Sequence, residues 1–305
     1  MGKISIIGAG FVGSTAAYAL FIRRVASEIA LIDVHGEKAA GHALDLEHGM
    51  QFASRTKITY GSSHSLCKGS DIVVIAAGRP QKPGETRPDL IKGNAEIFRE
   101  LIPAITKSAP NAVLMVVSNP VDALTYLALK YSRLPPSRVF GTGTALDTAR
   151  FRYLLGEHYD MDPRSVHAYL LGEHGDSSFP LWSSANVAGI PLKNLPDYNR
   201  RKLDSVFQQA KRAAYEVIAR KGSTYYAIGL VISELAHAIL SDSNSVYPVS
   251  TMLKGYHGER NVCLSVPCVL GKGGIKRQLT VPMDSSEMRA FKKSAAIIRK
   301  SLRGV

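Results

Sequence analysis

Residues 3–13 have the sequence KISIIGAGFVG, an apolar run that ends in the glycine spacing GxGxxG. A helical stretch follows, and residues 28–33, EIALID, then form a second apolar run. That run ends in Asp33, which lies 20 residues after the last glycine of the motif. A GxGxxG motif alone is a weak signal, but strand, glycines, helix, strand and terminal acid in this order predict a dinucleotide-binding unit.

Each residue of the glycine motif has a separate expected role. Gly8 permits a tight turn, Gly10 lets the backbone approach a pyrophosphate, and Gly13 lets helix and strand pack closely. Phe11 and Val12 lie between these glycines, where the helix N-terminus favours the negative charge of a phosphate. We therefore expect all five residues to bind the cofactor.

The acid at the end of the second strand selects the cofactor. The carboxylate of Asp33 is expected to accept hydrogen bonds from the ribose hydroxyls and to repel an added phosphate. This predicts NAD over NADP. Ligands of parallel sheets collect at the carboxyl ends of the strands. Gly78 and Asn119, which each follow an apolar strand, are further candidates there.

The alternation of strands and helices continues to about residue 141, and several of the strands are almost wholly apolar. This pattern predicts a parallel sheet covered on both faces, so residues 1–141 are expected to be an N-terminal Rossmann domain with a doubly wound sheet. After residue 141 long helices are followed by strands joined by short turns, which favour antiparallel pairing. Residues 142–305 are therefore expected to be a C-terminal α+β substrate domain.

Composition excludes several classes of protein. A hydrophobic content of 45% with 21% charged residues is typical of a globular protein, and no apolar run is long enough to cross a membrane. Three cysteines without metal-ligand spacing predict neither a disulfide framework nor a metal site, and they favour the cytoplasm. The net charge of +13 fits a solvated surface, an anionic ligand or weak polyanion binding, but no nucleic-acid-binding motif is present.

A candidate acid/base lies in residues 169–176, YLLGEHGD, where a short strand ends in a turn that contains His174. A lone histidine is more often an ordinary polar residue, so its neighbours decide. Asp147 and Arg150 are spaced i and i+3 on a predicted helix, which also fits a simple ion pair. Residues 81–87, QKPGETR, form a polar loop that is either a lid carrying Arg87 or an ordinary solvated loop.

Five motifs occur in order along nearly the whole chain: GAGFVG, GRPQKPGETR, SNPVD, LDTARFR and LGEHGD. Together they are far more specific than any one of them. With these motifs the chain resembles the L-lactate and malate dehydrogenase superfamily, and most closely the bacterial L-lactate dehydrogenases.

The resemblance implies a role for each candidate. His174 would be the acid/base, and Asp147 would hold its imidazole in the correct tautomer and favour the charged form. Arg150 would bind the substrate carboxylate through two parallel hydrogen bonds. Arg87 would polarise the ketone, and Asn119 would orient the substrate and the nicotinamide. The implied reaction is reduction of pyruvate to L-lactate by NADH.

Substrate choice is expected to depend on Gln81, which matches the family position that meets the variable end of the substrate. An uncharged side chain there leaves a second carboxylate uncompensated. Thr224 would close the same end of the pocket. Arg79 departs from the family pattern and could pair with the second carboxylate of a dicarboxylate substrate. A malate or branched 2-hydroxyacid dehydrogenase is therefore the alternative.

The resemblance also implies regulation. Arg152 and His167 match positions that bind fructose bisphosphate at a subunit interface in allosteric bacterial members. The assembly implied is a homotetramer, in which an anion would bridge the facing positive charges. The alternative is that both are ordinary surface residues. From another class of protein, a catalytically silent NAD-binding or polyanion-binding protein would also fit the charge. Mere binding would not require all four of His174, Asp147, Arg150 and Arg87, which argues against it.

Overall fold

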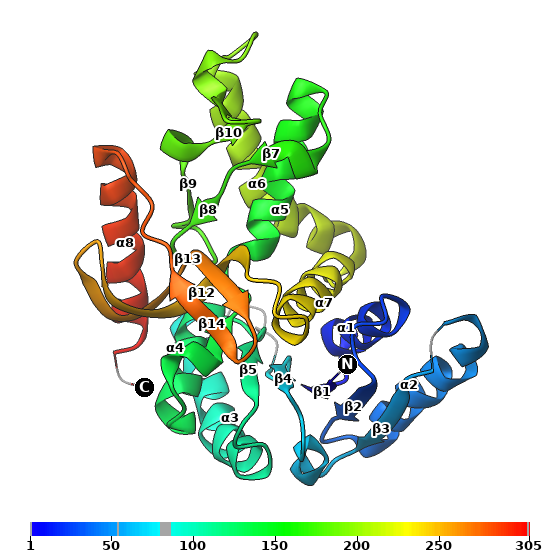
Figure 1. The fold of residues 1–305 in the computed structure, drawn as a ribbon. Coiled ribbons are helices and arrows are strands. Elements are labelled where there is room, and N and C mark those ends of the chain that lie inside the picture. The colour runs from blue at the N-terminus through cyan, green and yellow to red at the C-terminus, as the bar shows by residue number, and fades with distance from the viewer. Residues whose placement is uncertain (1, 54, 80–86, 304) are drawn as a thin grey trace.

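The computed structural model describes residues 2–53, 55–79, 87–303 and 305. Strands alternate with helices through the first half of the chain (Figure 1). The elements of this half are β1 (Lys3–Ile7), α1 (Phe11–Ile22), β2 (Glu28–Ile32), α2 (Gly36–His48), β3 (Lys57–Gly61), β4 (Ile72–Ile75), α3 (Arg87–Ser108), β5 (Val113–Val116), α4 (Val121–Ser132) and β6 (Val139–Gly141).

The second half begins with a helix and five very short strands, and it continues with two long helices and three longer strands before the last helix. Its elements are α5 (Ala145–Tyr159), β7 (Val166–His167), β8 (Leu170–Leu171), β9 (Phe179–Pro180), β10 (Asn186–Val187), β11 (Ile190–Pro191), α6 (Arg200–Lys221), α7 (Tyr226–Leu240), β12 (Ser245–Tyr256), β13 (Glu259–Gly271), β14 (Gly274–Gln278) and α8 (Ser285–Ser301).

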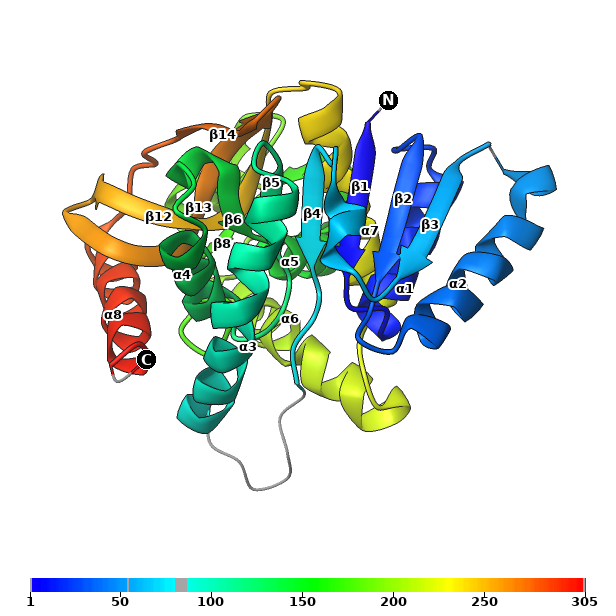
Figure 2. The ribbon, with the colours of Figure 1, turned by 90° about the horizontal axis from the view of Figure 1, so that it is seen from below.

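The main sheet of the described residues has the strand order β14-β13-β12-β6-β5-β4-β1-β2-β3 (Figure 2). Strands β1 to β6 pair in parallel, and the order reverses between β1 and β4. In a doubly wound sheet such a reversal opens a crevice at the carboxyl ends of the strands, where a dinucleotide binds. The predicted fold class is confirmed.

The central strands β1, β4 and β5 of this sheet are buried on both faces, as their apolar sequences predict. In β1, Ile4 and Ile6 pack in one core cluster with helices α1, α2 and α7, whereas Ile7 packs in the other with α3 and α4. This alternation is the period of two that a strand imposes on its side chains. A fully buried side chain of this size contributes roughly 1.5–3 kcal/mol relative to an exposed one.

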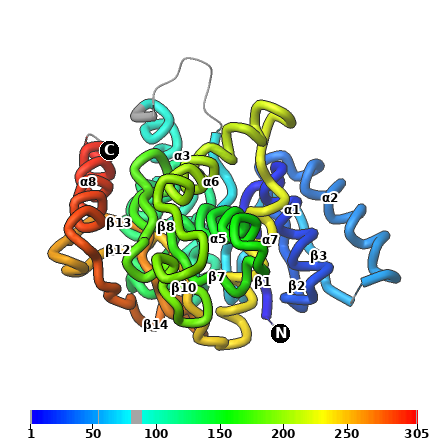
Figure 3. The backbone as a smooth tube through the Cα atoms, turned by 90° about the horizontal axis from the view of Figure 1, so that it is seen from above, coloured from blue at the N-terminus to red at the C-terminus, as the bar shows by residue number. Residues whose placement is uncertain are grey.

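The three long strands of the second half are antiparallel, as expected from their short turns. They continue the main sheet, because β12 pairs with β6 through Ser250 and Gly141. A separate core lies between α5 and α6, and Figure 3 shows α7 placed between α5 and α1. The small sheet of β7, β10 and β11 was not predicted, because strands of two residues carry no periodic pattern.

No helix of the described residues has the length and apolar character needed to cross a bilayer.

Candidate active site

The glycine loop after β1 is compact where the sequence predicts a tight turn. Gly8 has a φ of +97°, and a Cβ there would lie 2.8 Å from the backbone nitrogen of Ala77. A Cβ on Gly13 would lie 1.8 Å from the Gly8 carbonyl oxygen, so only glycine fits between helix and strand. A Cβ on Gly10 would meet nothing within 4 Å, which leaves the backbone open to a ligand at the start of α1.

Asp33 follows β2 and turns its carboxylate toward this loop. One oxygen accepts a hydrogen bond from the Ala9 backbone N–H at 2.6 Å, and the other accepts from His35 N–H at 3.0 Å. Each carboxylate oxygen can accept more than one hydrogen bond, so both keep capacity for ribose hydroxyls. The open loop and this carboxylate fit the adenosine diphosphate half of NAD.

Two further residues of the predicted cofactor site lie near this loop. Val12 follows Phe11 in the first turn of α1, and Gly78 follows β4 with a φ of +159°. The Phe11 ring is 69% exposed and stacks on Tyr225, with centroids 5.2 Å apart. This contact brings the segment after Thr224, between α6 and α7, against the cofactor loop.

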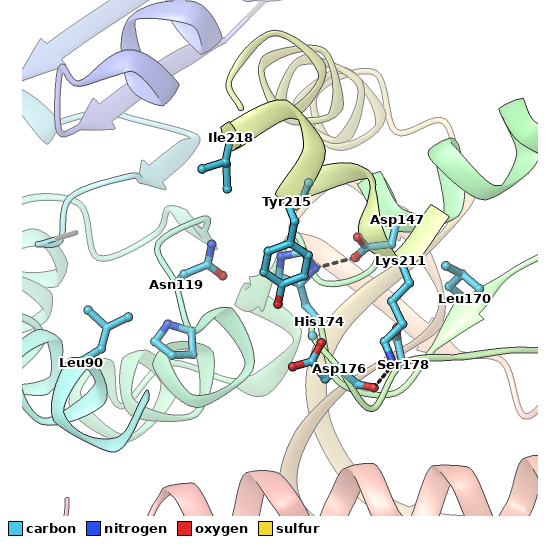
Figure 4. Close-up of a pocket in the computed structure, with 13 residues that line it drawn as sticks. Leu90, Asn119, Asp147, Leu170, His174, Asp176, Ser178, Lys211, Tyr215 and Ile218 are labelled. Atoms are coloured by element: carbon cyan, nitrogen blue, oxygen red, sulfur yellow. Dashed lines mark hydrogen bonds and ion pairs between the residues drawn. The ribbon is translucent and has the colours of Figure 1, made fainter. Parts of the chain in front are cut away.

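A pocket of about 420 Å³ contains His174 (Figure 4). It is built from the first turn of α3, the turn before α4, helix α5, the connection between β8 and β9, and one face of α6. The described residues that line it are Leu90, Asn119, Pro120, Asp147, Leu170, His174, Gly175, Asp176, Ser178, Lys211, Ala214, Tyr215 and Ile218.

His174 and Asp147 form the predicted pair at the centre of this pocket. The Nδ1 atom of His174 lies 2.5 Å from an Asp147 carboxylate oxygen, and Figure 4 shows the imidazole facing that carboxylate. Burial favours the neutral imidazole, but the charge and hydrogen bond of Asp147 outweigh it and raise the pKa of His174. The ring is therefore held with Nδ1 toward α5, so that proton transfer would use Nε2.

Asp147 is itself held by Arg150. The two side chains meet at 3.2 Å on one face of α5, and both are largely buried. Burial favours a neutral carboxyl, but His174 and Arg150 together outweigh it and lower the pKa of Asp147. The carboxylate thus stays ionised beside the imidazole. Neither Arg150 nor Thr224 is among the described residues that line the pocket.

Asn119 lines the pocket at the carboxyl end of β5, where its peptide bond to Pro120 is cis. Its backbone carbonyl accepts a hydrogen bond at 2.9 Å from the buried side chain of Asn94, in α3. The same Asn94 side chain accepts a hydrogen bond from the Arg79 N–H at 2.9 Å. A single buried amide therefore joins α3 to both strand-end segments.

Part of the predicted specificity loop lies outside the described residues. Gln81 lies outside the described residues, whereas Arg87 is the first residue of α3. The Arg79 guanidinium donates to the Asp89 backbone carbonyl at 2.9 Å and occupies the space beside Gly93, where a Cβ would meet it at 2.1 Å. Arg79 is therefore directed along the first turns of α3.

The α6 face of the pocket was missed in the sequence. Lys211, Tyr215 and Ile218 lie on one side of this helix, and Lys211 donates a hydrogen bond to the Asp176 carbonyl. Tyr215 is 62% exposed and Ile218 is 45% exposed. The apolar spacing of α6 did not mark this face, because Leu203, Val206 and Ala210 of the same helix are buried in the core instead.

The two predicted regulatory residues, Arg152 and His167, are not among the described residues that line the His174 pocket. The Arg152 Nε donates to the Ala168 carbonyl at 2.8 Å, and the guanidinium lies 4.9 Å from the centroid of the Tyr169 ring. His167, the preceding residue of β7, is exposed. Arg152 also lines a second pocket of about 280 Å³, together with Arg164 and Glu234.

Within the part of the chain that the structure describes, no group of three or more His, Cys, Asp or Glu side chains is arranged to hold a metal ion.

A dinucleotide loop lies at the carboxyl end of β1, and the pocket of the histidine–aspartate pair includes Asn119 at the carboxyl end of β5. This arrangement defines an NAD-dependent oxidoreductase of the two-part α/β type. Family models agree: the lactate/malate dehydrogenase NAD-binding domain matches residues 2–141, and the alpha/beta C-terminal domain of the same family matches residues 144–305. The chain belongs to the lactate/malate dehydrogenase family.

Similar proteins cover almost the entire chain. The L-lactate dehydrogenase of Acetivibrio thermocellus is 45% identical over 306 residues, which cover 99% of this chain and 96% of that protein. The L-lactate dehydrogenase of Thermoanaerobacter pseudethanolicus is 46% identical, with 98% and 97% covered. The crystal structure of the minor L-lactate dehydrogenase from Enterococcus mundtii in its ligands-bound form is 40% identical, with a TM-score of 0.96 over 100% of this chain and 98% of that one.

Proposed function

We propose that this protein is an L-lactate dehydrogenase, which reversibly reduces pyruvate to L-lactate with NADH. The observation that carries the proposal is the 2.5 Å contact between His174 Nδ1 and the Asp147 carboxylate, inside a pocket that also contains Asn119. The names of relatives that are 45% and 46% identical over nearly the full length support the same substrate.

His174 is the proposed proton donor in this reaction. Protonated His174 donates from Nε2 to the ketone oxygen, while Asp147 stabilises the imidazolium and keeps Nδ1 protonated afterwards. Bound NADH supplies the hydride to the carbonyl carbon. In lactate oxidation the same nitrogen accepts the hydroxyl proton, which requires neutral His174.

Two arginines and Asn119 complete the proposed chemistry. Arg150, next to Asp147 on α5, would bind the substrate carboxylate, because a guanidinium matches a carboxylate through two hydrogen bonds. Arg87, at the start of α3, would polarise the ketone oxygen. Asn119 would orient the substrate and the nicotinamide from the carboxyl end of β5.

The proposed preference for pyruvate over oxaloacetate depends on Gln81, with Thr224 closing that end of the pocket. The position of Arg79 supports this preference, since its guanidinium lies along α3 and bonds the Asp89 carbonyl. A second carboxylate on the substrate would then lack a charged partner at Gln81.

The finer parts of the proposal concern organisation and regulation. We place the cofactor domain at residues 1–141 and the substrate domain at 142–305; the ranges of the two family models support this boundary. We further propose a cytoplasmic homotetramer in which Arg152 and His167 bind fructose bisphosphate. The contact of Arg152 with Ala168, the residue that follows His167, supports a shared anion.

The experiment is a substrate panel with NADH: pyruvate, oxaloacetate and a branched 2-oxo acid, each with and without fructose bisphosphate. The proposal predicts the highest kcat/KM for pyruvate and a lower pyruvate KM with the bisphosphate. A preference for oxaloacetate or the branched acid would replace it with the corresponding 2-hydroxyacid dehydrogenase. NADH binding without turnover of any of the three acids would instead indicate a silent binding protein.

A further inference from the structure

A second carboxylate contacts His174, and no role has been assigned to it above. It belongs to Asp122, in the first turn of α4. One of its oxygens accepts a hydrogen bond from the His174 backbone N–H at 2.8 Å. The other accepts from the Ser250 hydroxyl, in β12, at 2.6 Å. Asp122 is only 1% exposed, so these contacts lie in the interior.

The place of Asp122 in the chain gives these contacts a consequence. Asn119, which lines the pocket, lies three residues before Asp122, in the turn that precedes α4. The Asp122 carboxylate therefore joins the segment of Asn119 directly to the main chain of His174 and, through Ser250, to the central sheet. These two walls of the pocket share no stretch of sequence, and a movement between them would displace the proton donor from its substrate.

A buried carboxylate is a costly way to make such a link, because charge is poorly solvated in the interior. Burial raises the pKa of Asp122 to about 6, although the contacts with Ser250 and His174 lower it and the nearby Glu173 raises it. Burial raises the pKa of the Cys263 thiol in β13, and the charge of Asp122 raises it further. An uncharged residue of similar volume would cost less, so the charge itself calls for an explanation.

The groups around His174 explain why a charged residue is buried at position 122. Asp147 and Asp122 both favour the charged imidazole, whereas burial and the Arg150 guanidinium oppose it. Asp147 contacts the ring and Asp122 contacts the backbone N–H. The two carboxylates thus contact different parts of His174, and the negative charge of each favours the protonated imidazole.

We propose that Asp122 is a positioning residue for proton transfer: it fixes the main chain of His174 relative to Asn119, and its negative charge helps to keep His174 protonated. The inference rests on the proposed function, in which His174 is the acid. Asp122 does not line the pocket among the described residues, so it acts through His174.

Two substitutions separate the charge from the contact. Asp122→Asn keeps an oxygen that can accept from the His174 N–H but removes the negative charge. Asp122→Ala removes both, which leaves a buried N–H without its acceptor. Asp45→Asn is the matched control, since Asp45 is an exposed carboxylate on α2 whose loss changes the net charge equally.

The test uses the full chain and two measurements. The first is the pH dependence of kcat and KM for NADH-dependent pyruvate reduction. The second is an NMR titration of the histidine ring signals without substrate, with the His174 signal assigned from its loss in His174→Asn. For Asp122→Asn we expect both the decline of pyruvate reduction and the titration of His174 to move to lower pH, with KM little changed. Asp45→Asn should move neither.

For Asp122→Ala we expect kcat to fall by up to about a hundredfold, because small displacements of a catalytic group can cost that much. An unchanged His174 titration in folded Asp122→Asn would overturn the role of the charge. Wild-type kcat in folded Asp122→Ala would overturn the positioning role. If Asp122→Ala does not fold, Asp122→Ser tests the positioning role instead: its shorter side chain does not reach the His174 N–H, and an unchanged kcat would overturn that role. Failure of the wild-type protein to reduce pyruvate would overturn the proposed function, and the NMR titration would still decide whether Asp122 acts on His174.

Discussion

The dinucleotide loop and the His174 pocket are assembled in different ways. The loop takes its shape from residues 8–13, and its contact with Asp33 joins residues 24 apart in the chain. In the pocket, His174 meets Asp147 across 27 residues, and Asp122 meets Ser250 across 128. The tight turn of the loop is therefore made within residues 8–13, although Gly8 also packs against Ala77 and Phe11 against Tyr225. The pocket depends more fully on distant elements that pack against one another.

This difference predicts two kinds of variant. Changes in the loop should weaken NADH binding and leave the proton donor intact. Changes in the pocket should slow turnover and leave NADH binding intact.

The largest effect is expected from His174→Asn in the pocket. Loss of the proton donor should lower kcat for pyruvate reduction by about 10²–10⁴-fold, the usual range for general acid catalysis. NADH affinity, measured by fluorescence titration, should remain near the wild-type value because the glycine loop is untouched. A parallel loss of NADH binding would show that the two regions are not separable.

The loop should respond to Gly13→Ala. The new Cβ would lie 1.8 Å from the Gly8 carbonyl oxygen, and overpacking of this kind typically costs about 1–3 kcal/mol. If that cost falls on the binding conformation, NADH affinity drops roughly ten- to hundredfold. Gly41→Ala in α2 is the control, since its Cβ would meet nothing within 4 Å and NADH affinity should not change. Wild-type NADH affinity in Gly13→Ala would contradict the close packing of the loop.

A smaller effect is expected from Arg150→Lys, next to Asp147 on α5. A lysine keeps the charge but loses the two-pronged geometry, so the KM for pyruvate should rise by about tenfold or more while kcat changes less. Steady-state kinetics at saturating NADH measures both values. An unchanged KM would show that Arg150 does not bind the substrate carboxylate.

The smallest expected effect is a displacement of the pH profile of the wild-type protein. Pyruvate reduction needs protonated His174, so its rate is lost as pH rises through the pKa of that residue. Asp147 raises this pKa, and the loss should therefore occur above the ordinary titration range of histidine. Lactate oxidation needs the neutral ring and should rise over the same interval. A decline of pyruvate reduction below the ordinary range would contradict the effect assigned to Asp147.

The sequence predicted the parts of the protein in which neighbours in the chain are neighbours in space. The glycine loop, the acid after β2 and the pairing of Asp147 with Arg150 on one helix all follow from spacing alone. The apolar strands likewise predicted a sheet buried on both faces. Local periodicity is sufficient in these cases, because it determines which side chains point the same way.

The remaining features depend on packing between distant segments. No pattern near Asp122 indicates that its carboxylate would reach the His174 backbone, and the spacing of α6 did not show that Tyr215 faces the pocket. The continuation of the main sheet through β12 was also hidden, since the pairing of Ser250 with Gly141 joins residues 109 positions apart (250 minus 141). Such contacts follow from the tertiary fold and leave no periodic signal.

The proposed function requires this chain to catalyse the transfer of a hydride and a proton to pyruvate. The deciding measurement is to incubate the purified protein with NADH and pyruvate, follow NADH oxidation and resolve the product by enantiomer. We expect one L-lactate formed for each NADH consumed, and a rate about 10²–10⁴-fold lower for His174→Asn at the same protein concentration. NADH that binds but is not oxidised, or a product other than L-lactate, would contradict it.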